Sequence, residues 1–459
     1  MTVYSIQFII LYFRNLNCGI RFFLASSLQA SSSLIFTAEK MDSLPDAVVQ
    51  YILSSLTNAK DVASCNCVSK KFKDSMPYIT SLYFPRSIFD HLSHGQTPDG
   101  IVMKMISSTS RLEELVVYCR FTAIGLASWL LLVSPSLKNL ELRMDDLVDQ
   151  NTPIDCPSKL ECVQVARNLE SLKLWGVLMV RAPKWDVFHK LTILEIVGAK
   201  LKDAVLTEVL RSTPNVTNLV LLKCEGLRNV WIELLELKHS KLDFYGLGSC
   251  SLTLRAPKIE SLEVQGCSWI RVRETNCLKN LSIANNDGRV YMVDFGKLTM
   301  LESLSIRGVQ WCWDAISKML QFATEVKHLY MKIEFTGDFE ALLPFPEINF
   351  VDFFKSHPKL TSFDIHGAMF AALCHKNSLK NVDSSFVIPS LEEVVITVRS
   401  PLNAEQKMST LEAMVKFANK LKKMKIKILQ MRSGHCSADD FFEEICKFRF
   451  MNHKLISIE

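Results

Sequence analysis

An apolar pattern recurs along most of the chain, from about residue 100 onward. Its template is Leu-x-x-Leu-x-Leu, with Ile, Val, Phe or Met replacing Leu at some positions. The last two apolar residues are two apart, which is the spacing of a β-strand with one buried face. The matches are Leu112/Leu115/Val117, Leu137/Leu140/Leu142, Leu160/Val163/Val165, Leu169/Leu172/Leu174, Leu191/Leu194/Ile196, Val216/Leu219/Leu221, Ile259/Leu262/Val264, Leu278/Leu281/Ile283, Leu301/Leu304/Ile306, Val326/Leu329/Met331, Leu360/Phe363/Ile365, Leu391/Val394/Ile396 and Leu421/Met424/Ile426.

This spacing predicts a repeat protein. A strand this short is not stable alone, so successive strands must stack in parallel and share one core. From Leu112 to Leu421 the matches are on average about 26 residues apart, within the range of leucine-rich repeats. Prolines such as Pro135 and Pro214 precede several strands and end the segment before them. The sequence therefore predicts an α/β fold, an irregular leucine-rich-repeat solenoid with parallel strands over residues 100–432.

The segments that return from one strand to the next differ along the chain. Helical spacing is found at 100–105, 125–133, 203–210, 314–322 and 403–417. Between residues 222 and 301 the gaps are shorter, and extended or turn structure is expected there in place of helices. Residues 433–459 contain an amphipathic stretch at 439–450, which we expect to form a C-terminal capping helix.

Residues 41–72 carry a different pattern, with apolar residues every three or four positions. Pro45 suits a first helical turn, and a polar break at 58–61 can cap a second helix. Two or three short helices cannot close a core unaided, so we expect a partner to cover their surplus apolar surface. The first helix would carry Leu44, Val48, Val49, Ile52, Leu53 and Leu56, and the second Val62, Cys65, Val68 and Phe72.

The order and spacing of these residues resemble the F-box, here over residues 41–88. The chain departs from the family pattern at Ala47, where an acidic residue is usual, and at Phe72, where Trp is usual. The resemblance implies binding to the Skp-type adaptor of a Skp–cullin–F-box ubiquitin ligase. The adaptor-binding residues it implies are Leu44, Pro45, Val48, Ile52, Leu53, Leu56, Val68 and Phe72.

Irregular repeats that follow an F-box resemble the plant-type F-box/leucine-rich-repeat proteins, and this resemblance spans residues 41–459. It implies a non-enzymatic substrate-recognition subunit of the E3 ligase, located in the nucleus or cytoplasm. Its partners would be the adaptor, through it a cullin, and a target protein bound by the repeats. The alternative is an interaction scaffold outside any ligase, in which the F-box-like hairpin merely caps the solenoid.

Composition and motifs exclude several other classes. A net charge of +5 over 459 residues indicates no general nucleic-acid binding. No apolar run reaches the 18 residues or so of a membrane-spanning helix. The 14 cysteines include no C-x-x-C pair and are expected to be buried free thiols. Catalytic and nucleotide-binding motifs are missing, so we expect no cofactor, and His91 and His94 suit a solvated loop better than a metal site.

Residues 1–40 differ from the rest, with no acidic residue before Glu39 and five serines in 26–33. We expect a poorly ordered extension or an addition of the gene model. A transit peptide is the alternative, although only Arg14 and Arg21 supply positive charge.

Target binding is expected on the concave face, where side chains alternate with the buried ones. Glu141 and Arg143 are among these positions. Trp175, Tyr330 and His366 are the strongest candidates, because exposed aromatic residues often anchor interfaces. The alternative is that these side chains are solvated or covered by a neighbouring loop.

The last predicted strand is basic. Lys423, Lys425 and Lys427 alternate on one face, and residues 402–432 contain eight Lys or Arg against two Glu. Such a strand could bind an acidic or phosphorylated target segment, or a small ligand that carries phosphate. The preferred interpretation is an edge strand that lysines protect against sheet-to-sheet association.

Overall fold

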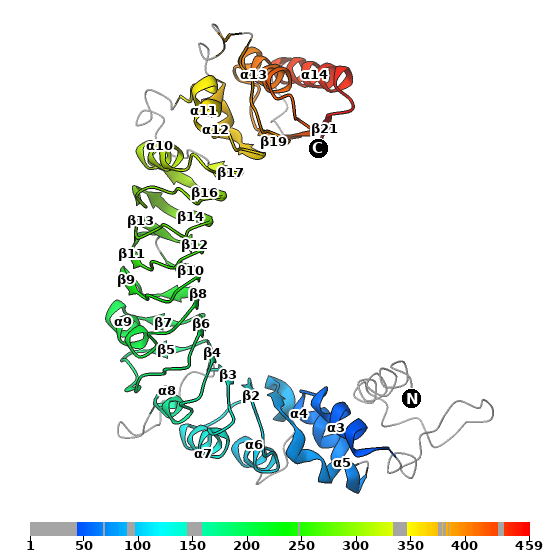
Figure 1. Cartoon of the computed structure of the whole chain (residues 1–459), viewed down its shortest axis with the longest axis vertical. Helices are drawn as coiled ribbons and strands as arrows, with labels where there is room; N and C mark the ends of the chain where they lie inside the picture. Colours follow the sequence, from blue (N-terminus) through cyan, green and yellow to red (C-terminus); the bar gives the residue numbers. More distant parts are fainter. Residues whose placement is uncertain are drawn as a thin grey trace, which may run out of the picture. The chain divides into compact units, whose positions relative to one another are not determined.

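The computed structural model describes residues 44–67, 69–89, 97–144, 158–246, 248–333, 347–374, 379, 382–383, 385–429 and 436–459. They form two compact units, coloured in chain order in Figure 1. Unit 1 comprises the residues up to Lys200 together with 211–215, and unit 2 comprises Leu201–Leu210 and Val216–Glu459. The expected extension at 1–40, Val68, His91 and His94 lie outside the described residues.

Unit 1 begins with a helical module, residues 44–78, and continues as a parallel sheet. The module contains α3 (Asp46–Ser54), α4 (Ala59–Asn66), α5 (Lys70–Asp74) and the 3-10 turn η1 (Met76–Tyr78). Strands then pair in chain order: β1 (Ser81–Phe84), β2 (Glu114–Val117), β3 (Asn139–Arg143), β4 (Ser171–Trp175) and β6 (Ile193–Val197). The segments between them contain η2 (Arg86–Phe89), α6 (Pro98–Ser107), α7 (Ala123–Val133), α8 (Lys159–Cys162), η3 (Val163–Val165) and β5 (Leu178–Met179), and β7 (Lys200–Leu201) follows β6.

Unit 2 contains a longer parallel sheet with the same order of pairing. Its strands are β8 (Asn218–Glu225), β10 (His239–Tyr245), β12 (Ser261–Gln265), β14 (Asn280–Val290), β16 (Ser303–Trp311), β17 (His328–Ile333), β18 (Ser362–His366), β19 (Glu393–Val398), β20 (Lys423–Ile428) and β21 (Ile456–Ile458). The helices are α9 (Asp203–Arg211), α10 (Trp313–Phe322), α11 (Phe350–Ser356), α12 (Gly367–Leu373), α13 (Ala404–Phe417) and α14 (Cys436–Met451). Alternate strand residues, such as Leu304 and Ile306, are fully buried and form the core.

A second parallel sheet lies beside the first part of the unit 2 sheet, to the left of β8, β10, β12 and β14 in Figure 1. Its four strands are β9 (Asn229–Glu233), β11 (Cys250–Arg255), β13 (Cys267–Arg273) and β15 (Met292–Asp294). Leu252, Leu254 and Ile270 of these strands point inward and are buried. The expectation of extended returns between residues 222 and 301 is therefore confirmed.

The strand pattern is confirmed with one exception. Leu160, Val163 and Val165 lie in α8 and η3, because Ser158 and Glu161 form a reciprocal capping box that starts a helix. Among the strands that pair in chain order within the two units, the pattern missed β1, β10 and β21. The sheet of unit 1 thus begins within the segment assigned to the F-box, and the sheet of unit 2 ends after the predicted capping helix, which is α14.

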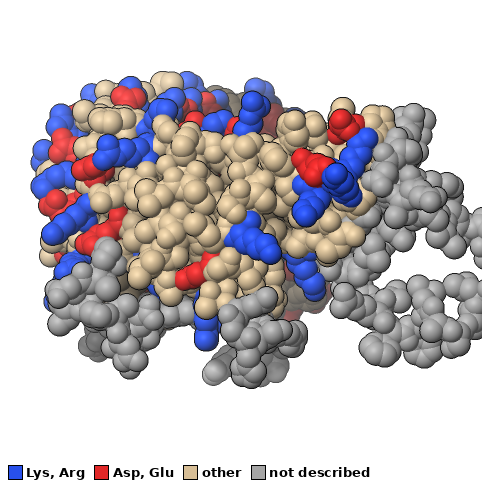
Figure 2. All heavy atoms as spheres, turned by 90° about the horizontal axis from the view of Figure 1, so that it is seen from below, with Lys and Arg blue, Asp and Glu red and all other residues tan. Residues whose placement is uncertain are grey.

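Helix α7 is apolar around most of its circumference and has no charged residue. Leu126, Trp129 and Leu130 are buried, whereas Ile124 and Leu131 are 74% and 66% exposed. Figure 2 shows the face on which α6 and α7 lie, with a wide area almost free of Lys, Arg, Asp and Glu. Exposed apolar area of this kind is uncommon on a monomer's surface.

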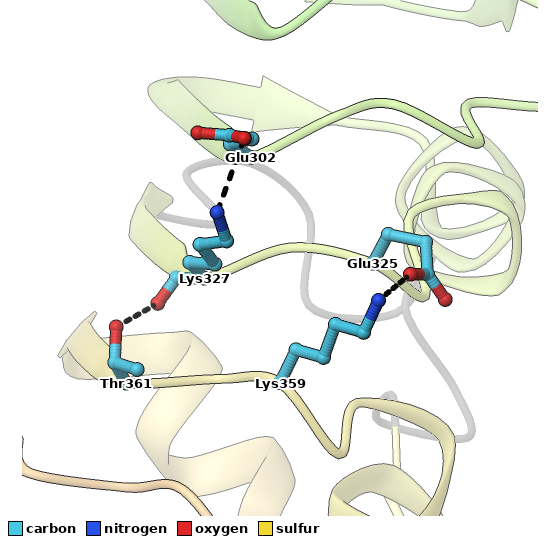
Figure 3. A network of polar contacts seen from close by, with 5 residues as sticks. All are labelled: Glu302, Glu325, Lys327, Lys359 and Thr361. Carbon is cyan, nitrogen blue, oxygen red and sulfur yellow. Dashed lines mark hydrogen bonds and ion pairs between the residues drawn. The ribbon is translucent and has the colours of Figure 1, made fainter.

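An alternating ladder of Glu and Lys accompanies the strands. The residue after the first apolar position of each repeat donates its N–H to the same position of the preceding repeat, as from Glu302 to Lys279 and from Lys327 to Glu302, both at 2.8 Å. In Figure 3 the side chains of Glu302 and Lys327 also pair, at 3.1 Å, and Thr361 Oγ1 donates to the Lys327 carbonyl at 2.9 Å. Further rungs are Glu113–Lys138 and Glu260–Lys279 at 3.0 Å, and Glu392–Lys422 at 2.7 Å.

Candidate functional site

The predicted adaptor-binding residues of the helical module do not share one exposed surface. Leu44, Ile52, Leu53, Leu56 and Phe72 are all buried, at 4% exposure or less, among residues of this chain. The helices close this core among themselves, since α3 and α4 both pack against α5, and α3 and α5 pack against η1. The module also joins the sheet: Asn58 bridges Tyr83 of β1, and Tyr83 N donates to the Thr57 carbonyl at 2.7 Å. The expectation that a partner must cover this apolar stripe is therefore wrong for these five residues.

The outward face of α3 offers a different set of side chains. Pro45 is exposed and Val48 is half-buried. Tyr51, one turn after Ala47, is 56% exposed. Lys71 pairs with Asp46 at 2.9 Å and also donates to the Leu44 carbonyl, which ties α5 to the start of α3. The module therefore presents a rigid, partly apolar face made by α3.

The open face of each sheet is the side whose residues alternate with the buried ones, and it corresponds to the predicted concave face. In unit 1 it carries a cluster around Glu141 of β3. Trp175 Nε1 donates to Glu141 Oε1 at 2.9 Å, and the Tyr118 hydroxyl donates to the same oxygen. Tyr83 packs edge-on against Tyr118, with ring centres 5.4 Å apart. Trp175, a sequence candidate, is 36% exposed and belongs to this cluster.

The electrostatics of this cluster follow from its packing. Burial raises the pKa of the Tyr118 hydroxyl well above its usual value, and the adjacent Glu141 carboxylate raises it further. Tyr118 therefore stays protonated and remains a hydrogen-bond donor to Glu141. The Arg143 guanidinium lies over the Tyr118 ring at 6.0 Å from its centre.

In unit 2 the open face brings Tyr330 and His366 together. Their rings meet edge-on at 5.5 Å, because β17 and β18 are neighbouring strands. His366 Nε2 lies 3.0 Å from Asp364 Oδ1. Burial raises the pKa of Tyr330, and Asp364 adds to this while Arg307 opposes it. These two sequence candidates thus form one polar and aromatic cluster.

The basic strand is β20, and it is not an edge. Strand β21 pairs along it in parallel, with Met424 opposite Ile456 and Ile426 opposite Ile458. The preferred edge interpretation is therefore wrong. The sequence did not reveal β21, because only two apolar residues mark it and a helix was expected to end the chain.

The three lysines of β20 remain on the open face. Lys425 Nζ pairs with Glu459 Oε1 at 2.5 Å, and this contact, more than Lys423 and Lys427, lowers the pKa of Glu459. Lys423 is exposed and Lys427 is half-buried. Their role in binding an acidic target stays a prediction.

Sequence reasoning missed the roles of Tyr83 and Tyr118, although Tyr118 occupies the open-face position two residues after Val116. It also missed an aromatic pair on the outside of the second sheet. Trp269 and Tyr291 stack there at 5.3 Å, with an interplanar angle of 20°. Arg289 lies over the Tyr291 ring at 5.5 Å.

None of the helices in the described residues is both long and apolar enough to cross a membrane. Within the same residues, no group of three or more His, Cys, Asp or Glu side chains is placed to hold a metal ion.

Comparison with known proteins agrees with this architecture. The family described as "At1g61320/AtMIF1, LRR domain" matches residues 102–385. The chain is 62% identical over 419 residues to a protein named F-box protein At1g10780 from Arabidopsis thaliana. That match covers 91% of this chain and 100% of the relative.

Proposed function

Because this chain belongs to the plant-type F-box/leucine-rich-repeat proteins, we propose that it is the substrate-recognition subunit of a Skp–cullin–F-box ubiquitin ligase. The helical module would bind the Skp-type adaptor and, through it, a cullin. The repeats would bind a target protein. The proposal rests mainly on one observation: the chain joins this module to a parallel repeat sheet, and the open face of that sheet carries polar and aromatic clusters.

The burial pattern supports a revised docking surface on the module. Pro45, Val48 and Tyr51 line the outward face of α3 and are the side chains available for contact. Leu44, Ile52, Leu53, Leu56 and Phe72 would act by holding α3 in place. Tyrosine is among the residues that most often carry binding energy at interfaces.

In this proposal the protein works by proximity. It forms no covalent bond itself, and holds a target lysine near an enzyme that carries ubiquitin. The gain comes from replacing a bimolecular encounter by a reaction within one complex. Rigid attachment of the module to β1 supports this role, because it limits the motion between the adaptor site and the first repeats of unit 1.

The test is co-purification of the full chain with a Skp-type adaptor after Val48→Glu and Tyr51→Lys are introduced together. We expect adaptor recovery to fall at least 30-fold, as for the loss of a central interface anchor. Tyr245→Lys is the matched control, because Tyr245 is 60% exposed but lies in β10 of unit 2. Unchanged recovery of the adaptor by the double variant would count against the proposed docking surface.

One observation favours the alternative of a scaffold outside any ligase. The module covers the free side of β1 through the Asn58–Tyr83 bridge, as a solenoid cap does. If that were its whole role, the unmodified chain would recover no Skp-type adaptor, whereas the ligase subunit recovers it. The same experiment therefore separates the two functions.

A further inference from the structure

We propose that Glu141, framed by Tyr118 and Trp175, binds a Lys or Arg side chain of the target protein. This inference rests on the proposed function, because it assigns a ligand chemistry to the repeat surface of unit 1. The proposed ligand is a cationic side chain, and its site lies outside the helical module proposed to bind the adaptor.

The first argument is the unbalanced charge of Glu141. Its Oε1 accepts two hydrogen bonds, from Trp175 Nε1 at 2.9 Å and from the Tyr118 hydroxyl. Both donors are neutral, and Lys173, which lies opposite Glu141 in β4, pairs with Glu195 on its other side and not with Glu141. The neighbouring open-face carboxylate Glu195, in contrast, pairs with Lys173 at 3.5 Å. A carboxylate fixed in direction by two neutral donors is ready to accept a charge-assisted hydrogen bond.

The second argument is the arrangement of aromatic rings. Tyr118, which directly follows β2, and Trp175 of β4 come from the two sides of β3, and both donate to the Glu141 carboxylate. Tyr83 holds the Tyr118 ring edge-on from β1. Cations bind favourably over the faces of Trp and Tyr, and a ligand cation here would gain from both the carboxylate and the rings.

The third argument is that this surface already holds one cation. The Arg143 guanidinium lies 6.0 Å from the centre of the Tyr118 ring, which is the arrangement of a cation attracted by an aromatic face.

The test uses two fluorescent octapeptides of equal length, one with alternating Arg and Gly and one with alternating Glu and Gly. Each is titrated by anisotropy into the full chain co-purified with its adaptor. A chain of net charge +5 repels the basic peptide in general, so its binding requires a local acidic site. We expect the basic peptide to bind the unmodified protein despite this repulsion, whereas the acidic peptide measures attraction to the lysines elsewhere on the chain.

Glu141→Gln keeps the shape of the side chain and removes its charge. We expect it to weaken the basic peptide about 10-fold, which is the usual effect of losing a hydrogen bond to a charged partner. Trp175→Leu should weaken it several-fold through loss of the ring. Glu114→Gln is the control on the same face, and should change binding less than twofold because its carboxylate accepts from the Ser81 hydroxyl at 2.6 Å and lies outside the Tyr118–Trp175 pair.

Equal losses from Glu141→Gln and Glu114→Gln would overturn the proposal, since they would indicate diffuse attraction to the whole face. The proposal would also be overturned if Glu141→Gln left the affinity for the basic peptide unchanged. Thermal unfolding of each variant shows whether the fold is intact, and Trp175→Phe gives a second variant that keeps a ring. Adaptor recovery is scored in the same samples, so failure of the peptide test with normal recovery leaves the ligase assignment standing.

Discussion

The repeats return to the sheet by two routes, and the length of the repeat decides which. With Leu237 as the first apolar position before β10, four successive intervals from Val216 to Leu301 measure 19 to 23 residues, and their returns are the strands of the second sheet. The intervals from Leu301 to Val326 and from Leu391 to Leu421 measure 25 and 30 residues, and their returns contain α10 and α13. In unit 1, the 25 residues from Leu112 to Leu137 contain α7.

The difference follows from how far each conformation advances per residue. The 10 residues of α10 cover about 15 Å at 1.5 Å per residue, whereas the 6 residues of β11 cover about 20 Å at 3.3 Å per residue. A helical return therefore needs more residues to cross the back of the sheet. Repeats shortened by a few residues must cross it as strands, and their strands then pair with one another.

The largest effect is expected where the strand returns turn most tightly. Gly266 lies between β12 and β13 with φ +82°, and an added Cβ would lie 2.0 Å from the Phe244 carbonyl oxygen. We expect Gly266→Ala to destabilise unit 2 by about 3 kcal/mol or more, measured by urea unfolding. Gly296→Ala is the matched control, because Gly296 has φ +65° and nothing within 4 Å of its Cβ. It should cost only about 1 kcal/mol of backbone strain. Equal losses of stability in the two variants would contradict the argument that close approach to the Phe244 carbonyl causes the larger loss.

A pH effect should distinguish the helical returns. His357 is buried at the end of α11, with Nδ1 2.8 Å from the Phe353 carbonyl and Nε2 3.1 Å from the Leu320 carbonyl of α10. Burial lowers its pKa below the ordinary value, more than the two carbonyls raise it. The unfolded chain then binds more protons below about pH 6.5, so stability is complete above that pH and falls as the pH drops below it.

We expect the urea midpoint of the unmodified protein to fall between pH 7.5 and pH 5.5 by more than that of His357→Gln. The variant is less stable at pH 7.5, but it lacks this titration. Parallel pH profiles for the two proteins would contradict the assignment to His357.

The alternation of apolar residues predicted the strands well, because it records directly which side chains are buried. The prediction failed where the same spacing of apolar residues had a different physical cause. At 160–165 the spacing also suits a helix, and the Ser158 cap decides the outcome. In β10, Ser240 occupies the buried position that Leu219 and Leu262 fill in the strands beside it, so the template did not match.

The sites were harder to predict than the strands. Spacing identified the apolar positions Leu44, Ile52 and Phe72 on two helices, but it could not show that α3, α5 and η1 pack together and bury them. The Glu141 cluster joins side chains from four strands, which become neighbours only once the pairing register is known. The alternation of Glu and Lys after the first apolar residue was a readable signal, since each pair lies one repeat apart.

A smaller effect is expected at Ser240, within the strand-return region. Its side chain is 5% exposed, and its hydroxyl has no hydrogen-bond partner in the described part of the chain. Ser240→Val removes this buried polar group and adds a β-branched side chain to β10, so we expect a gain of about 1 kcal/mol in urea unfolding. Ser305→Val, on the half-buried open face of β16, should change stability by less than about 0.5 kcal/mol. A loss at Ser240 would mean that the hydroxyl has a role that its contacts do not reveal.

The smallest effect concerns the Glu–Lys ladder, which accompanies both kinds of return. Lys422 Nζ pairs with Glu392 Oε2 at 2.7 Å, and the preceding rung position is the neutral Thr361. Lys422→Glu or Glu392→Lys alone places like charges together, and each should cost about 0.5 kcal/mol at low salt, since exposed pairs contribute little. The double variant restores an opposite pair in reversed order and should recover most of that loss.

Urea unfolding of the four proteins at two salt concentrations gives the coupling energy between Glu392 and Lys422 directly. It should shrink as the salt concentration rises, because these side chains are exposed. A coupling energy of zero at low salt would mean that the main-chain hydrogen bonds alone set the register. The charged side chains would then serve only to keep this edge of the repeats hydrated.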